Sequence, residues 1–164
     1  MDYPNSKERG YSNKYPKGNI NKKPNAAYQE IDYGPKPFII KIAQATKQNE
    51  TFRTTIWTGN YMQLTLMSIP EGSEIGLECH PHLDQFIRIE RGVGLVEMGY
   101  RKNRMHFRKN VGADCALFIP AGTWHNLINM GRSPLKLYSI YAPPEHPKGT
   151  IHLTKADADA DEHF

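Results

Sequence analysis

Seven short segments rich in β-branched and aromatic residues constrain the fold of this chain more than any other feature. Glycine and proline separate them, for example at Glu71-Gly72, Arg91-Gly92 and Ala121-Gly122. Short apolar runs with this punctuation and no long helical period are typical of an antiparallel β-sandwich or β-barrel. We therefore predict an all-β fold. The segments are PFIIKIA, TFRTTIWT, YMQLTLMSI, DQFIRIE, GVGLVEMG, CALFIP and KLYSIYA.

The sequence before the first apolar segment has a different character. Residues 1–34 are rich in proline, asparagine, tyrosine, lysine and glycine and show no apolar periodicity. Such a segment buries too little surface to offset the entropy cost of ordering it, so we predict a flexible, disordered N-terminal arm. Two interpretations of the arm stay open, a solvated tail without function and an interaction arm that uses Tyr3, Tyr11 and Tyr15.

The remaining chain divides into a predicted barrel and a short extension. Residues 35–147 contain the β-rich segments and form one predicted domain, and residues 148–164 form a C-terminal extension. Within the extension, Thr154 and Asp157 have the S/T-x-x-D/E spacing of a capping box. We therefore predict one short helix, which begins near Thr154.

Charge and cysteine content restrict the partners. The net charge is +4, of which residues 1–36 carry +3 (seven basic and four acidic groups), so the body is nearly neutral. Without a clustered basic face we expect no nucleic-acid partner. No apolar run approaches the ~20 residues that span a bilayer, and the N-terminus lacks an apolar signal core. Two cysteines, Cys79 and Cys115, suit free thiols in the cytoplasm, although one bridge stays open.

Two segments carry the candidate chemistry, ECHPHLDQFIRIERG (78–92) and FIPAGTWHNLIN (118–129). In the first, His80 and His82 are two residues apart, so on a straight strand both imidazoles project from one face, together with Glu78. Gln85 joins that face only if the chain turns or bulges near Leu83-Asp84.

The second segment adds one more imidazole. Pro120-Ala-Gly122 predicts a turn, His125 opens the strand that follows, and Asn129 has the parity of His125. Three neutral imidazoles and an amide oxygen would form a site with open coordination positions. Such a site suits a divalent transition metal such as Zn, Mn, Fe, Ni or Co. The other histidines are expected to have no role in a site; they are His106, His146, His152 and His163.

The paired segments resemble the two motifs of the cupin superfamily. Pro120, Gly122, His125 and Asn129 match the second motif, and His80 and His82 match the first. Gln85 occupies the position of the usual glutamate. The resemblance implies a double-stranded β-helix, or jelly roll, with a metal ion at its centre. In particular, the chain is similar to small bacterial single-domain cupins that are described as mannose-6-phosphate isomerase-like. By this resemblance His80, His82, Gln85 and His125 would be the metal ligands.

A glutamine in place of a glutamate leaves the bound ion its full double charge, which strengthens its Lewis acidity. This favours polarisation of a substrate oxygen over oxygen-activating iron chemistry. Glu78 is the first candidate for a catalytic base, with a solvated acid as the alternative, and Glu97 is the second candidate. Four further residues could line a pocket, although packing is the favoured role for each: Trp57, Gln63, Tyr138 and Tyr141. For phosphate binding the candidates are Arg53 and Arg88.

Three functional hypotheses follow. The first is a metal-binding protein that acts on a small polar metabolite such as a sugar or sugar phosphate, as a metal-dependent isomerase. The second is a metal-dependent dioxygenase or decarboxylase, and the third is a ligand-binding or assembly protein without catalysis. Because exposed sheet edges are commonly covered by pairing, we expect a homodimer in each case.

Overall fold

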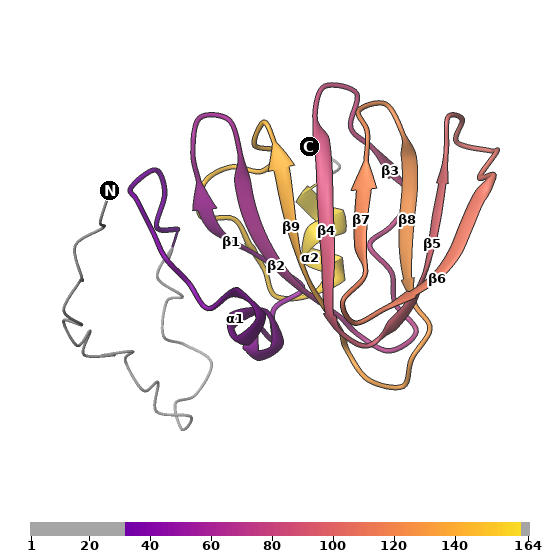
Figure 1. The fold of residues 1–164 in the computed structure, drawn as a ribbon, viewed down its shortest axis with the longest axis horizontal. Coiled ribbons are helices and arrows are strands. Elements are labelled where there is room, and N and C mark those ends of the chain that lie inside the picture. The colour runs from indigo at the N-terminus through magenta and orange to yellow at the C-terminus, as the bar shows by residue number, and fades with distance from the viewer. Residues whose placement is uncertain (1–31, 162–164) are drawn as a thin grey trace, which may run out of the picture.

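Two antiparallel β-sheets face each other and enclose the core (Figure 1). The structure, a computed structural model, describes residues 32–161, so residues 1–31 of the predicted arm and His163 lie outside the described residues. The six-stranded sheet has the order β10-β1-β2-β9-β4-β7, and the four-stranded sheet has the order β3-β8-β5-β6. This arrangement confirms the predicted all-β fold.

The first sheet is built from strands that are far apart in the sequence. Its members are β1 (Arg53–Thr58), β2 (Gln63–Ile69), β4 (Asp84–Arg91), β7 (Ala116–Ile119), β9 (Leu135–Ala142) and β10 (Ile151–His152). The second sheet contains β3 (Glu78–Cys79), β5 (Val93–Gly99), β6 (Phe107–Gly112) and β8 (Trp124–Asn129).

Alternation along the strands explains which side chains face inward. In β4, Gln85, Ile87 and Ile89 are buried, whereas Asp84 is exposed. Gln85 is paired with Tyr141 of β9, and Tyr141 is paired with Gln63 of β2, so these three side chains form one row on the inner face. The apolar core lies further along the barrel. It consists of Phe52, Met67, Ile69, Ile75, Ile87, Ile89, Val96, Leu117, Ile119, Leu127, Leu135, Leu137 and Ala158.

Of the two helices, one was predicted from the sequence and the other was not. The C-terminal helix α2 (Lys155–Asp161) confirms the predicted short helix, and its capping box is present because Thr154 N donates to Asp157 Oδ2 at 2.8 Å. The prediction of a strand in PFIIKIA was wrong. Helix α1 (Ile42–Gln48) begins inside that segment, and Ile39 just before it is 96% exposed.

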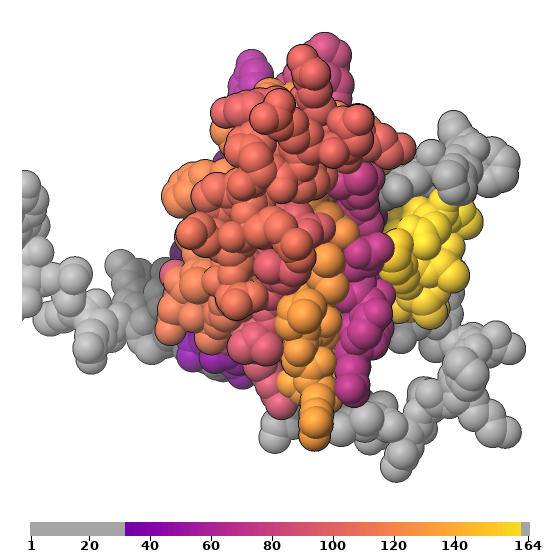
Figure 2. Space-filling model, turned by 90° about the vertical axis from the view of Figure 1, so that its right-hand side faces the viewer, coloured from indigo at the N-terminus to yellow at the C-terminus, as the bar shows by residue number. Residues whose placement is uncertain are grey.

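The C-terminal segment closes one side of the barrel. Strand β10 pairs with β1 and extends the six-stranded sheet beyond residue 147, the predicted end of the barrel. Helix α2 lies behind this sheet in Figure 1, and in Figure 2 it lies beside the magenta segment of residues 70–80. Lys155 Nζ is accordingly 3.5 Å from the position that a Cβ would take on Gly76.

Candidate metal centre

Glu78, His80 and His125 lie together at one end of the barrel. Strand β3 pairs with β8 so that Glu78 is directly opposite His125, and His80 follows β3 immediately. The Nε2 atoms of His125 and His80 are 3.1 and 3.3 Å from Glu78 Oε1. One ligand atom from each residue lies within 4.8 Å of the others. The three side chains are largely buried, with 13% of Glu78, 12% of His80 and 2% of His125 exposed.

The turn before β8 fixes the orientation of His125. Its Nδ1 atom is 2.9 Å from the carbonyl oxygen of Thr123, and a carbonyl can only accept, so Nδ1 carries the proton. When the ring is neutral, Nε2 therefore directs its lone pair toward Glu78. Two acceptors at this distance repel each other unless a proton or a cation lies between them. Gly122, which has φ +77, forms this turn and donates its N–H to His80 O at 2.8 Å.

His80 lies between two carboxylates. Its Nδ1 atom is 3.3 Å from Glu145 Oε1, while its Nε2 atom faces Glu78 and is buried without a well-directed hydrogen bond. Burial lowers the pKa of His80, but its close contacts with the carboxylates of Glu145 and Glu78 outweigh burial and raise the pKa to about 9. Burial likewise raises the pKa of Glu78, yet its contacts with His125 and His80 hold that pKa well below the ordinary value. The centre thus attracts positive charge.

These donors fit a divalent transition metal. A four-coordinate zinc ion with bonds of about 2.0–2.1 Å places neighbouring ligand atoms roughly 3.3 Å apart. The two nitrogen–oxygen separations in the centre are 3.1 and 3.3 Å. Two imidazoles and one carboxylate would leave at least one coordination position for a ligand, as catalytic sites require. Glu145 would orient His80 through Nδ1, which is the usual role of a carboxylate behind a histidine ligand.

A cavity of about 510 Å³ lies next to this centre, large enough for a small-molecule ligand. The loop after β9 forms its outer wall, where Gln63 of β2 holds the backbone of His146 through hydrogen bonds in both directions. The lining residues are Arg53, Glu78, Cys79, His80, Glu145, His146, Pro147, Thr150, His152 and Asp161.

The structure does not bring all four predicted metal ligands together. His80 and His125 are part of the group, but His82 is exposed in the turn after β3. The parity argument assumed a straight strand through His82, whereas β3 ends at Cys79. Gln85 faces inward, as a turn before it allows, and donates to Ser139 Oγ at 3.0 Å. Its Oε1 atom is buried without a hydrogen-bond partner.

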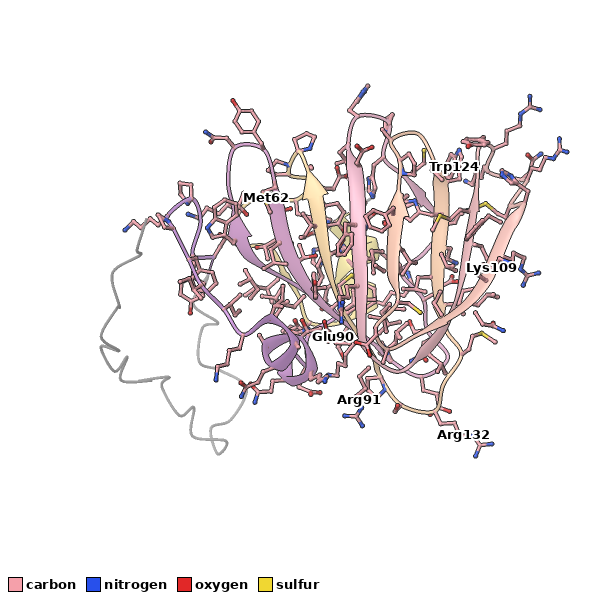
Figure 3. The ribbon with its side chains drawn as sticks, in the orientation of Figure 1. Met62, Glu90, Arg91, Lys109, Trp124 and Arg132 are labelled. Carbon is pink, nitrogen blue, oxygen red and sulfur yellow. The ribbon has the colours of Figure 1, made fainter. Side chains whose placement is uncertain are left out.

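Other candidate residues have clear positions. Glu78, the predicted base, lies between the two imidazoles, while Glu97 forms an ion pair with Arg108 at 2.8 Å. Trp57 donates to Lys36 O at 2.7 Å and Arg88 pairs with Glu90 and Asp114, so neither lines the cavity. Figure 3 shows Glu90 and Trp124 at opposite ends of the barrel.

Sequence reasoning missed several residues of the cavity, among them Glu145, His146 and His152. They belong to the loop after β9 and to β10, outside the two motif segments. His146 and His152 were expected to have no role in a site, yet both line the cavity. Glu145 and His146 follow the last predicted strand, which ends at Ala142, within four residues, whereas His152 lies in the predicted C-terminal extension.

Two antiparallel sheets that enclose a group of two histidines and one carboxylate define a class of small β-barrel proteins. Comparison with known proteins then identifies the family. The model of the cupin domain matches residues 65–141. The uncharacterized protein YrkC of Bacillus subtilis is 63% identical over 131 residues, which are 80% of this chain and 70% of YrkC. The chain therefore belongs to the cupin superfamily.

Solved structures support the same fold. The crystal structure of BH2720 from Bacillus halodurans is 59% identical, with a TM-score of 0.79 over 79% of this chain and 98% of that chain. A Klebsiella pneumoniae protein with a double-stranded β-helix domain is 19% identical, with a TM-score of 0.55 over 73% and 100% of the two chains. These likenesses confirm the predicted jelly roll. Within residues 32–161, neither helix is long and apolar enough to cross a membrane.

Proposed function

We propose that this protein is a metal-dependent cupin that binds and acts on a small polar metabolite. Glu78, His80 and His125 would hold one divalent transition metal, and the substrate would enter the adjacent cavity. The observation that carries the proposal is the convergence of two imidazole nitrogens on one carboxylate oxygen, 3.1 and 3.3 Å away. Members of this family often bind a metal.

The chain's own groups would have separate tasks. The ion would supply Lewis-acid polarisation of a substrate oxygen. Thr123 O would fix the tautomer of His125, and Glu145 would fix that of His80. Because Glu78 would hold the ion, it would not act as a separate catalytic base, the role that the sequence suggested for it. We propose isomerisation of a sugar or sugar phosphate as the first reaction to measure, because polarisation of a substrate oxygen by the ion suits it.

Metal analysis of the purified full-length chain tests the proposal. We expect about one divalent transition metal per chain when neither metal nor chelator is added, determined by elemental analysis. His125→Ala and Glu78→Gln remove a ligand and should lower metal affinity by at least tenfold in a chelator competition, because each takes away a third of the protein's donors.

Two histidine variants provide the comparison. His82→Ala should keep its metal if the ligands are those grouped by the structure, and His106→Ala, an exposed histidine, should behave as wild type. A chain that carries no metal and binds none on addition would contradict the proposed function. Loss of metal from His82→Ala would instead favour the ligand set that the sequence resemblance implies.

The setting of the protein is also a proposal. We propose a cytoplasmic homodimer, since Cys79 and Cys115 are both free thiols and the edge strand β7 presents Phe118 with 73% of its surface exposed. Sedimentation equilibrium at micromolar concentration should give twice the chain mass, and Phe118→Ser should weaken association. A monomer at all concentrations would contradict the dimer.

A further inference from the structure

Arg53 is a buried cation in the wall of the cavity. It is 1% exposed and projects inward from β1, where it is paired with His152 of β10. Its NH1 group contacts His152 Nδ1 at 3.4 Å, while its Nε atom has no hydrogen-bond partner. Within residues 32–161, no carboxylate oxygen lies within 4.0 Å of the guanidinium.

The hydrogen bonds around Arg53 bring no carboxylate of residues 32–161 into direct contact with the guanidinium, although Glu78, Glu145 and Asp161 line the same cavity. The guanidinium can only donate, so His152 Nδ1 accepts and His152 Nε2 donates to Asp161 Oδ2 at 2.7 Å. His152 is therefore satisfied as a neutral ring and brings no negative charge to Arg53. Buried arginines are normally paired, because an unpaired charge in a protein interior is costly. An anion in the cavity would supply the missing partner.

His146 offers a second donor beside Arg53. Its Nε2 atom is buried without a hydrogen-bond partner among residues 32–161, and its backbone is held in place by Gln63. Burial, and next the positive charge of Arg53, lower the pKa of His146 to about 3. The ring is therefore neutral at physiological pH and can present an N–H to an anion without adding charge.

We propose that Arg53 and His146 form an anion-binding subsite, and that the natural ligand is a small oxyanion with a carboxylate or phosphate group. The planar guanidinium matches the geometry of both groups. Arg53 lines the same cavity as Glu78 and His80, so one ligand can place its anionic group on Arg53 and another oxygen at the metal centre. This second contact rests on the proposed function, whereas the anion subsite stands on Arg53 and His146.

Calorimetric titration of the full-length chain with sodium phosphate and with sodium malonate tests the subsite. Both titrations are carried out on the protein as purified and after removal of metal by chelator and dialysis. We expect at least one anion to bind in both states. Arg53→Gln should weaken this binding by about ten- to a hundredfold, because charge-assisted hydrogen bonds are lost. The tighter of the two probes distinguishes a phosphate from a carboxylate ligand.

Arg132→Gln is the matched control, since Arg132 is exposed in the loop after β8 (Figure 3). This variant should bind both anions with the affinity of wild type. If Arg53→Gln does not fold, His146→Gln replaces it and should weaken binding several-fold. Equal affinity in wild type and in the cavity variant, or no binding of either anion to wild type, would overturn the subsite.

The failures of the two proposals can be separated. Arg53 does not belong to the metal-binding group, so Arg53→Gln should keep its metal content. A protein that carries no metal as purified, takes up none on addition and still binds phosphate through Arg53 would contradict the proposed function and leave the subsite supported. A protein that carries metal but binds neither anion would contradict the subsite and leave the proposed function supported.

Discussion

The side chain of Asn129 holds the loop after β8 through four hydrogen bonds. Its amide nitrogen donates to the carbonyls of Ile69, Pro70 and Ser133, and its oxygen accepts from Gly131 N–H. The residue is 3% exposed. Although its parity with His125 suggested a place near the metal site, these contacts give it a structural role.

Asn129→Ala should therefore reduce stability without affecting the metal. Removal of the amide leaves buried carbonyls without a donor, and we expect the free energy of unfolding to fall by about 2–4 kcal/mol. Urea denaturation measures this change, and elemental analysis of the folded variant should give the metal content of wild type. A stable variant that has lost its metal would place Asn129 in the metal site instead.

At the residue scale the sequence predicted two of the three residues in the candidate metal group, His80 and His125, as metal ligands. His80 and His125 belong to two segments with a recognisable spacing, so their approach could be predicted. His82 was placed beside them because side chains alternate in a strand, but the strand ends before Pro81, which lacks an N–H for a sheet ladder. Where a strand has only two residues, parity carries little information about the residues beyond it.

Helix α1 packs against the six-stranded sheet through Thr46, which is fully buried. Its Oγ1 atom has no hydrogen-bond partner. Lys136 of β9 donates to the carbonyl of Asn49 and to Glu50 Oε1, so the end of the helix is also attached to the sheet. The helix is thus anchored by the buried side chain of Thr46 and by the cation of Lys136.

Thr46→Val should stabilise the protein. Valine keeps the shape of threonine and removes a buried hydroxyl that has no partner, so we expect the free energy of unfolding to rise by about 1 kcal/mol. Thr51→Val is the matched control, because the Thr51 hydroxyl donates to Asn49 Oδ1 at 2.8 Å and its loss should destabilise. Thermal unfolding distinguishes them, and a destabilised Thr46→Val variant would contradict the absence of a partner for Oγ1.

At the element scale, six of the seven predicted segments form strands (β1, β2, β4, β5, β7 and β9), because each combines β-branched or aromatic residues with a clear end. Strands β6 and β10 were not predicted, because FRKNVG and IH contain no apolar run. The PFIIKIA segment was misleading because its isoleucines suggested a buried strand. Residues 42–48, IAQATKQ, contain alanine, glutamine and lysine, which favour a helix, and only Thr46 of them is buried. The local helix preference therefore decides, since Ile39 is not buried against a sheet.

Asp32 connects three parts of the chain that are far apart in the sequence. Its Oδ1 atom accepts from the N–H groups of Gly34 and Thr58, and its Oδ2 atom accepts from the Thr58 hydroxyl and Gly149 N–H. The loop that contains Gly149 also contains Pro147 and Thr150, which line the cavity. Asp32 thus attaches the cavity wall to the barrel. This contact could not be predicted from the sequence, because no motif marks it.

The charge of Asp32 should make this attachment dependent on pH. Burial raises its pKa, but the hydrogen bonds from Thr58, Gly34 and Gly149 outweigh burial and lower the pKa below the ordinary 3.8. A carboxyl whose pKa is lower in the folded state stabilises the protein above the unfolded-state pKa. That contribution is lost as pH falls through the folded-state value.

Asp32→Asn should therefore be less stable than wild type at pH 7, by about 1 kcal/mol, because two or more charge-assisted hydrogen bonds become neutral. The difference should shrink as the pH falls below the unfolded-state pKa of about 4 and through the lower folded-state pKa, where the wild-type carboxylate also takes up a proton. Chemical denaturation of both proteins between pH 2.5 and 7 measures this convergence. Asp114→Asn is the control, since the side chain of Asp114 is 85% exposed. A gap between wild type and Asp32→Asn that stays constant down to the lowest pH would show that the carboxylate charge of Asp32 does not hold the loop.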